Sequence, residues 1–567
     1  MSYQITVIAL FLTVFSSSGY VADIHSVPLK TQASLTKIVP QKGPFKIAYM
    51  PPSREFNYYL DIGRGINNEA KKTNNIVVTV APQSDIPDIQ LKMMMEVIKS
   101  DYNAIILSTH APEKASSLIK EAIERGILVV IVNSDNLIYS TPVHAVVGYR
   151  QRNATKELGE YILKKHASRH LKIGIIKGAP GYHSQERVSG FYDVMIRNAI
   201  AVESIREGDW TTKGGYAAAM NMFNLHPNIN LVFSANDFEA LGVKSAIEAL
   251  NLNDVFVYGN DGVPSALEQI YLGNMSGTVF TYPTKMGEIV MDVVIKSLHG
   301  QFEGGFVETP TIIIDKGNVE EVWVKPMVNS DSNLKKIIAV SAEIPRLSEA
   351  DGKGLYWDIL REVYSPFGVK FSHLLVPMKR AKRMVKQNQA DLMLGSLRGD
   401  VDGVRYPQWH YSSDIVSVVF NNDKFPTWQG QETLRNKNVH WIRGQDYHHY
   451  LYVPVNKFET TDSTQGIGKL IKNRADFYID SAFNINNLLQ SKKRDLDALP
   501  GTNSGFRVEE VIRLKQYIAF ANTQKGVELM WIFDEQFPKL LKSGKIRELF
   551  EKWEVTPFPF EQMDNFE

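Results

Sequence analysis

Three polar residues in the middle of the chain follow short apolar runs and could together bind a small molecule. Asn236, Asp261 and Thr281 each come directly or within a few residues after such a run. Helical patterns at 238–250 and 264–272 separate the runs, so the order is strand, loop, helix, repeated. In an open parallel sheet, ligands bind at the carboxyl ends of the strands. We therefore expect these three side chains to converge and to form hydrogen bonds with a small, hydroxyl-rich ligand.

Simpler roles exist for the same residues. Asn236 and Asp237 could cap the helix predicted from residue 238. Asp261 and Gly262 could form only a turn. The placement of Asn236 and Asp261 after successive strands favours the ligand site over these roles.

The size and charge of the chain limit its possible functions. Its 567 residues exceed what one hydrophobic core usually supports, so two or more domains are expected. A net charge of +1 gives no electrostatic reason to bind nucleic acid or an anionic membrane. The patterns Gly-x-Ser-x-Gly, His-Glu-x-x-His and Gly-x-Gly-x-x-Gly are absent from the sequence. We therefore predict a chain that is not an enzyme and has no cofactor or metal site.

The N-terminus is typical of an exported protein. Residues 5–15 are apolar and uncharged, and small residues follow them. We predict a cleaved signal peptide at 1–22, with a retained anchor as the alternative, because residues 1–4 contain no Lys or Arg. The chain has no cysteine, which excludes a lipoprotein anchor and disulfides. A large exported chain without disulfides fits a bacterial periplasm.

A repeated strand–helix pattern indicates an α/β fold in two tandem units. The pattern begins at residue 45, restarts at 171 and restarts again at 337, after a polar, turn-rich stretch. An amphipathic helix is predicted over 525–553, and a loose tail after 556. The predicted boundaries are 1–22 for the signal peptide, 44–326 for the first domain, 327–335 for a linker and 336–556 for the second domain.

Segments of the first half occur in the same order in a known family. They are 46–50, Tyr58-Tyr59 before Gly65, 102–108, 122–130, 186–191, Asp209-Trp210, Ala235-Asn236-Asp237 and Asp261-Gly262. Residues 45–325 thereby resemble the type I periplasmic sugar-binding proteins, the ribose-binding group. The resemblance implies two lobes, each a doubly wound sheet with flanking helices, that enclose a sugar.

The resemblance also implies roles for individual residues. Tyr58, Tyr59 and Trp210 would stack on the sugar, although a single aromatic such as Trp210 could also be a core residue. Asn236 and Asp261 would bind hydroxyls. The family often has Asp, Arg and Gln at three further positions, which this chain fills with Asn133, Gln185 and Thr281. On this interpretation, neutral groups replace a charged pair.

A second resemblance covers about 336–555. Its segments are 352–360, 377–381, 385–396, 517–523 and 549–553, of which 388–396 is the most specific. They resemble the type II solute-binding proteins, the amino-acid-binding family 3 group. The resemblance implies a second bilobal unit with its own cleft.

In that family an arginine binds the ligand carboxylate and an acidic residue binds the amine. Arg405 is the better match for the arginine, with Arg398 as the alternative and a surface role as the simpler interpretation. Asp480 is the acidic candidate, although it could be a helix cap. Arg443 lies in the loop that usually supplies backbone donors, and Glu343 lies in the first loop.

These expectations point to a periplasmic solute-binding protein with two modules. Each module would close on a ligand, sugar-like in the first and an amino acid or carboxylate in the second, and a membrane partner would read the closed form. That partner could be a sensor kinase or cyclase, or the permease of an ABC transporter. Two unlike modules on one chain favour the sensory role. A non-catalytic scaffold with degenerate clefts is the third alternative, and the second cleft departs more from its pattern.

Overall fold

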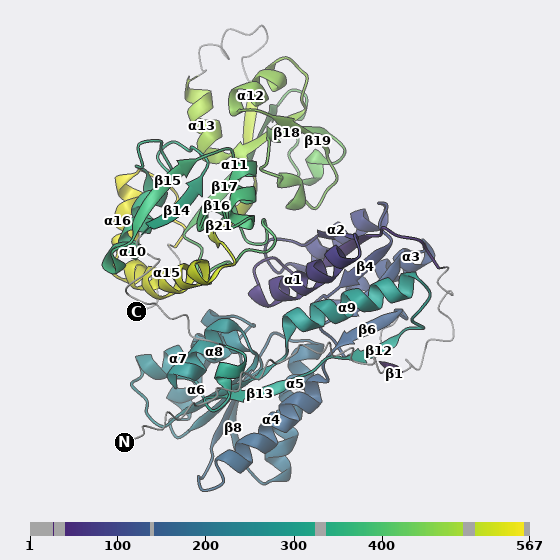
Figure 1. Ribbon diagram of the computed structural model, residues 1–567, viewed down its shortest axis with the longest axis vertical. Helices are drawn as coiled ribbons and strands as arrows, with labels where there is room; N and C mark the ends of the chain where they lie inside the picture. The colour runs from purple at the N-terminus through teal and green to yellow at the C-terminus, as the bar shows by residue number, and fades with distance from the viewer. Residues whose placement is uncertain (1–25, 28–39, 136–140, 324–335, 492–504, 561–567) are drawn as a thin grey trace, which may run out of the picture.

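The computed structural model describes residues 26–27, 40–135, 141–323, 336–491 and 505–560, which form three β-sheets flanked by helices (Figure 1). This arrangement confirms the predicted α/β class. The predicted signal peptide and linker lie outside the described residues. Within the described part, no helix combines the length and the apolar character needed to cross a bilayer.

The first sheet has the strand order β1-β12-β6-β5-β4-β2-β3. Its strands are β1 (Ser26–Val27), β2 (Lys46–Met50), β3 (Ile76–Thr79), β4 (Ala104–Leu107), β5 (Leu128–Val132), β6 (Ala145–Gly148) and β12 (Gly305–Glu308). The parallel strands β4, β5 and β6 are buried along their whole length, because helices cover both faces. One face packs on α1 (Asn57–Lys72) and α9 (Pro283–Leu298), and the other on α2 (Pro87–Ile98) and α3 (Pro112–Glu124).

The second sheet has the strand order β13-β11-β10-β9-β7-β8. Its strands are β7 (Ile173–Lys177), β8 (Val202–Glu207), β9 (Leu231–Ser234), β10 (Phe256–Asp261), β11 (Gly277–Phe280) and β13 (Ile312–Asp315). One face packs on α4 (Gln151–Lys165) and α5 (Tyr182–Arg197). The other packs on α6 (Thr212–Leu225), α7 (Asp237–Ala249) and α8 (Pro264–Leu272). The chain passes between the two sheets after β6, β11 and β12, so the sheets belong to two connected lobes.

The third sheet has the strand order β15-β14-β16-β21-β17-β20-β18-β19. Its strands are β14 (Lys336–Ser341), β15 (Lys370–Leu375), β16 (Leu392–Leu397), β17 (Ser412–Asn421), β18 (Asn438–Ile442), β19 (Asn456–Thr460), β20 (Phe477–Ser481) and β21 (Phe506–Phe520). The helices around it are α10 (Leu355–Tyr364), α11 (Met378–Lys386), α12 (Ser463–Ile471), α13 (Ala482–Ser491), α15 (Gln524–Lys542) and α16 (Lys545–Lys552). The sequence predicts a separate sheet for each lobe. Instead, β21 pairs with β16 near its C-terminal end and with β17 along most of its length, so one sheet runs through both halves.

Two predictions for the C-terminus are wrong. The single helix predicted over 525–553 is interrupted at Ser543 and Gly544, where the backbone of Gly544 is left-handed with φ of 79°. The tail is not loose up to residue 560. Phe560 is only 1% exposed, and its ring lies against Phe537 and His410.

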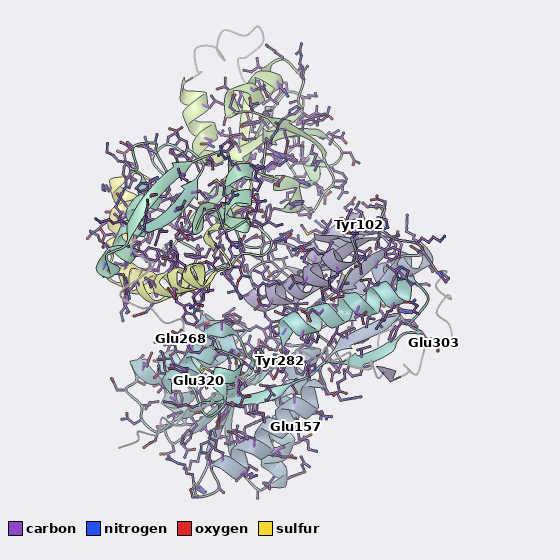
Figure 2. All side chains as sticks on the ribbon, viewed as in Figure 1. Tyr102, Glu157, Glu268, Tyr282, Glu303 and Glu320 are labelled. Carbon is purple, nitrogen blue, oxygen red and sulfur yellow. The ribbon has the colours of Figure 1, made fainter. Side chains whose placement is uncertain are left out.

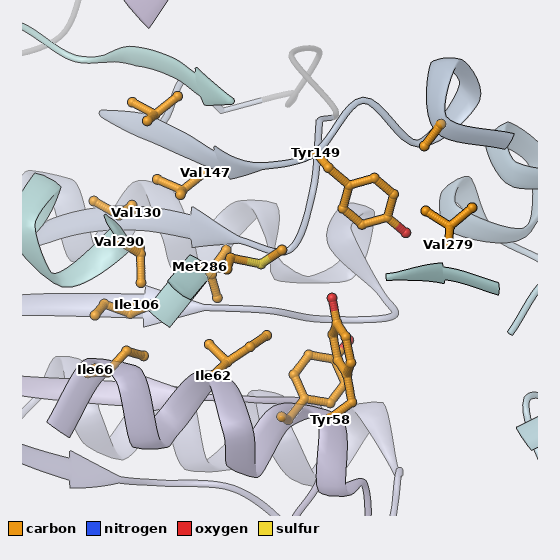
Figure 3. Packing of buried hydrophobic residues seen from close by; sticks show 14 of the residues in the cluster. Tyr58, Ile62, Ile66, Ile106, Val130, Val147, Tyr149, Val279, Met286 and Val290 are labelled. Carbon is orange, nitrogen blue, oxygen red and sulfur yellow. The ribbon is translucent and has the colours of Figure 1, made fainter. Parts of the chain in front are cut away.

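The first lobe depends on close contact between α1 and α9. Figure 3 shows Ile62 and Ile66 of α1 in the same core as Met286 of α9. Glycine lets the two helices approach, because a Cβ on Gly65 would lie 1.9 Å from the carbonyl oxygen of Thr284. The helices could accept this Cβ only by moving apart.

We predict that Gly65→Ala destabilises the full chain by about 1–3 kcal/mol, the usual range for overpacking. The backbone clash outweighs the higher helix propensity of alanine. Urea unfolding followed by circular dichroism gives the free energy. Gly468→Ala on α12 is the matched control, because nothing lies within 4 Å of the added Cβ. Equal stability of Gly65→Ala and the parent chain would contradict the packing.

Candidate functional site

A small cavity lies where the carboxyl ends of the strands of the first two sheets meet. Its volume is about 50 Å³. Its lining is Phe56, Tyr58, Tyr59, His110, Asn133, His183, Arg187, Trp210, Asn236, Phe238 and Asp261. These residues follow β2, β4, β5, β7, β8 and β9 or end β10, as the rule for parallel sheets requires. The structure therefore gathers Tyr58, Tyr59, Asn133, Trp210, Asn236 and Asp261 around one point.

A buried ion pair forms one wall of this cavity. Arg187 of α5 lies 3.0 Å from Asp261 at the end of β10, and their side chains are 5% and 9% exposed. The guanidinium also donates to the side-chain oxygen of Gln151 at 3.0 Å and to the carbonyl of Ala235 at 2.9 Å. Burial alone would lower the pKa of Arg187, but the Asp261 carboxylate raises it, so the arginine stays charged.

Arg187 occupies the place in the site that the sequence predicts for Gln185. Gln185 is exposed and does not line the cavity. The conclusion that neutral groups replace a charged pair is therefore wrong. Helical periodicity puts Arg187 on one face of α5 with Ser184 and Phe191, and in the structure this face is the buried one.

Tyr58 and Tyr59 form the wall from the first lobe. The hydroxyl of Tyr58 donates to Asn133 Oδ1 at 3.1 Å and lies 2.9 Å from Thr281 Oγ1. Burial raises the pKa of Tyr58 well above its ordinary value, so its hydroxyl remains a donor. Thr281 is fully buried behind Tyr58, and its hydroxyl also donates to the carbonyl of Asp261. Tyr58 and Thr281 thus connect the first lobe to the second.

Trp210 is held in a fixed position between the ion pair and the backbone. Its φ of 69° is left-handed, and a Cβ on Gly178 would lie 2.2 Å from its indole ring. Its main-chain N–H donates to Glu239 Oε1 at 2.8 Å. The guanidinium of Arg187 lies 5.5 Å from the centre of the ring. Trp210 is half-buried and lines the cavity, which places it at the site predicted for it.

Asn236 has both of the roles considered for it from the sequence, as a helix cap and as a residue of the cavity. It is the N-cap of α7, because its Oδ1 accepts the N–H of Glu239 at 2.8 Å. Its Nδ2 donates to the carbonyl of Trp210 at 3.0 Å, and the side chain also lines the cavity. Asp237 has a structural role, since its carboxylate accepts the N–H groups of Gly262 and Val263.

Two histidines that line the cavity, His110 and His183, were not predicted from the sequence as site residues. The rings of His110 and His183 lie 6.3 Å apart, edge to face. His110 Nδ1 lies 2.6 Å from Asp85 Oδ2, and His183 Nδ1 lies 2.7 Å from Gln151 Nε2. Burial, together with the charge on Arg187, lowers the pKa of His183 well below its ordinary value. Its ring is therefore neutral at pH 7 and can both donate and accept hydrogen bonds.

The residues predicted for the second cleft do not share a common hydrogen-bond or ion-pair partner in the structure. Glu343 is exposed, and Arg443 is 63% exposed and pairs with Glu459 at 3.2 Å. Asp480 is a structural residue, 1% exposed, whose carboxylate accepts four hydrogen bonds. The donors are Ser463 Oγ at 2.7 Å, the Tyr478 hydroxyl at 2.6 Å, the Ser481 N–H at 2.8 Å and Asn484 Nδ2 at 3.0 Å.

Arg405 lines a cavity between the two halves of the chain. Its Nε donates to Asn522 Oδ1 at 2.8 Å, and its side chain lines a larger cavity of about 700 Å³. That cavity lies between α1 and α8 of the first half and α15 of the second half, and Glu268 marks its α8 side (Figure 2). Burial and the neighbouring Arg64 lower the pKa of Arg405. The gathered polar side chains described above line the smaller cavity, so we place the candidate site there. Among the described residues, no group of three or more His, Asp or Glu side chains could hold a metal ion.

Comparisons with known proteins agree with a binding cavity in the first half. Residues 47–301 match the family described as a periplasmic binding protein domain. A D-ribose/D-allose-binding protein of Pseudomonas aeruginosa is 28% identical over 241 residues, 40% of this chain and 73% of that protein. A ribose import binding protein of Bacillus subtilis is 27% identical over 247 residues, 43% of this chain and 78% of that protein.

A solved solute-binding protein from Actinobacillus succinogenes with bound D-allose is 20% identical, with a TM-score of 0.46. It covers 49% of this chain and 99% of its own. Both sequence relatives are named binding proteins, which agrees with the prediction of a binding protein that is not an enzyme.

We predict that Arg187→Met destabilises the chain by about 3–5 kcal/mol, because it leaves Asp261 buried without its partner. Urea unfolding measures the loss. The double variant Arg187→Met with Asp261→Asn no longer has an unpaired buried charge. It should therefore regain part of the free energy of unfolding that Arg187→Met loses. Arg197→Met, at the exposed end of the same helix, is the control, with a change below about 0.5 kcal/mol. A small effect of Arg187→Met alone would show that the pair is not essential to the fold.

Stability should fall as the pH rises, because of two buried acids. Burial raises the pKa of Glu239 to about 8 and that of Asp237 to about 7. Both carboxyls favour folding at low pH, and this contribution is lost as the pH rises through these values. Between pH 6 and pH 9, Glu239 should account for a loss of about 2–3 kcal/mol. Glu239→Gln should show a clearly shallower decline in urea unfolding. An unchanged decline would rule out the raised pKa.

Proposed function

We propose that this chain, whose residues 47–301 form a type I, ribose/allose-binding-like periplasmic binding protein domain, captures a small sugar in the cavity between its first two sheets. The observation that carries the proposal is the buried Arg187–Asp261 pair beside Trp210 at the meeting point of both lobes. Each sugar hydroxyl donates one hydrogen bond and accepts others, so a fixed cation and a fixed carboxylate serve both needs. The indole ring offers an apolar face to the C–H groups of the sugar.

The size of the cavity supports capture by lobe movement. Its 50 Å³ compares with about 300–1,000 Å³ for typical small-molecule sites. A sugar would therefore enter only after the lobes separate or the lining side chains move. We propose a hinge at the three chain crossings, with the ligand stabilising the closed state over the open one.

We propose the domain limits 44–326 and 336–556, a linker at 327–335 and a cleaved signal peptide at 1–22 that exports the chain to the periplasm. In support, the strands of the first two sheets lie within 26–315 and those of the third within 336–520. We further propose that the second domain, of type II solute-binding ancestry, does not capture an amino acid. The other partners of Arg405, Arg443 and Asp480 support this.

We propose that the closed chain reports to a membrane sensor, a kinase or a cyclase. The support is the attachment of a second, unlike unit to the sugar-capturing one. Delivery to the permease of an ABC transporter is the second candidate, and the Bacillus subtilis relative, which is named for ribose import, supports it. Reconstitution with each membrane partner would separate the two roles.

The test of sugar capture is calorimetric titration and thermal melting of the full chain with D-ribose, D-allose and related monosaccharides. A sugar that binds the native state raises the melting temperature by mass action. We expect Trp210→Ala and Asp261→Asn each to weaken binding about tenfold or more, and the exposed Arg443→Gln to leave it unchanged. Absence of a thermal shift with every monosaccharide would reject sugar capture.

A further inference from the structure

One short segment contacts both the sugar cavity and the second domain. The segment, residues 51–60, connects β2 to α1 and begins that helix. Phe56, Tyr58 and Tyr59 line the cavity. Their neighbours Arg54 and Glu55 bond to residues of the second domain. The two sets of contacts therefore share one stretch of backbone.

Arg398 and Lys515 hold Glu55 from the second domain. The guanidinium of Arg398 donates to the main-chain carbonyl of Glu55 and, at 3.1 Å, to that of Gln408. It is 5% exposed, and its centre lies 4.1 Å from the ring centre of Tyr517. Lys515 Nζ lies 2.7 Å from Glu55 Oε1. Glu55 is thus bound through both its backbone and its side chain.

The rest of the segment packs against the same surface. Arg54 donates to the carbonyl of Thr79 at 2.6 Å within the first lobe and to that of Gly399 at 3.5 Å in the second domain. Its guanidinium lies 5.3 Å from the ring centre of Tyr450. Leu60 packs against an apolar cluster of the second domain that includes Tyr406. These contacts fix the segment on both sides of Glu55.

Other contacts between the domains avoid the cavity. Arg435 pairs with Glu96 of α2 at 2.9 Å, and Trp531 of α15 meets Trp323 edge to face at 5.4 Å. None of these residues lines the sugar cavity. They serve as internal controls, because they join the same domains without touching residues 51–60.

We propose that Arg398 and Lys515 are positioning residues for the sugar cavity, through which the second domain sets the affinity of the first. They fix the backbone at Glu55 and thereby the orientation of Phe56, Tyr58 and Tyr59. Coupling between two sites is reciprocal, so sugar binding also changes the strength of the contact with the second domain. The affinity readout rests on the proposed sugar capture; the positioning has a readout of its own.

The experiment compares full-chain variants that each lose one contact between the domains. Lys515→Gln removes the ion pair to Glu55, and Arg398→Gln removes the bond to its carbonyl. Arg435→Gln removes an ion pair of similar kind elsewhere and is the matched control. Sugar affinity is measured by calorimetry, and hydrogen exchange of residues 51–60 is measured without sugar.

We expect Lys515→Gln to weaken sugar binding about two- to fivefold and Arg398→Gln about tenfold, from the usual strength of exposed ion pairs and of charged hydrogen bonds. Both should speed exchange in residues 51–60, whereas Arg435→Gln should change neither quantity. Glu55→Gln combined with Lys515→Gln should weaken binding no more than either change alone.

Each outcome decides the proposal. Equal effects of Lys515→Gln and Arg435→Gln on affinity, with unchanged exchange in residues 51–60, would overturn positioning and leave only general docking. If the parent chain binds no sugar, sugar capture fails, and the exchange data alone decide whether the segment is held. If Arg398→Gln does not fold, Lys515→Gln still gives both readouts.

Discussion

The first half of this chain is organised around the buried pair of Arg187 and Asp261. Removing two charges from water costs several kcal/mol for each ion, and only good geometry with further hydrogen bonds offsets this. Gln151, Ala235 and Asn260 supply those bonds. Gln151 begins α4, directly after a crossing between the lobes, and Asp261 ends β10. The pair therefore requires that helices and strands from several parts of the chain reach one point with their ends in register.

Much of the fold was accessible from the sequence because local patterns specify it. The helix predicted at 264–272 has the bounds of α8, and the one predicted at 238–250 differs from α7 by one residue at each end. The apolar runs after Asn230 and Gly277 are strands, because parallel strands buried on both faces must be continuously apolar. The convergence of Asn236 and Asp261 followed from a rule about strand ends and needed no knowledge of side-chain contacts.

The rest could not be predicted because it depends on contacts between distant residues. Choosing Arg187 over Gln185 required the phase of α5, which is set by packing against β7 and β9. Asp480 has the residue type expected for a ligand contact, but Ser463, Tyr478 and Asn484 saturate its carboxylate. Arg398 bonds to the backbone of a residue 343 positions away. Every residue type has the same main-chain carbonyl, so the sequence of side chains could not identify this hydrogen-bond partner.

A β-bulge divides the longest ladder of the third sheet. Strands β17 and β21 carry their hydrogen-bond ladder through both halves of the second domain, and its register shifts between Val416 and Ser417, where Val511 is the extra residue. A β-bulge of this kind bends and twists a ladder locally. The bend falls between the pairs from Ser412 to Val416, whose register is regular, and the outer pairs that lead through β20 to β18 and β19. Lys515 lies in the regular inner stretch, opposite Ser413. The inner stretch therefore sets the position of the lysine that holds Glu55, and the bulge redirects only the strands farther out.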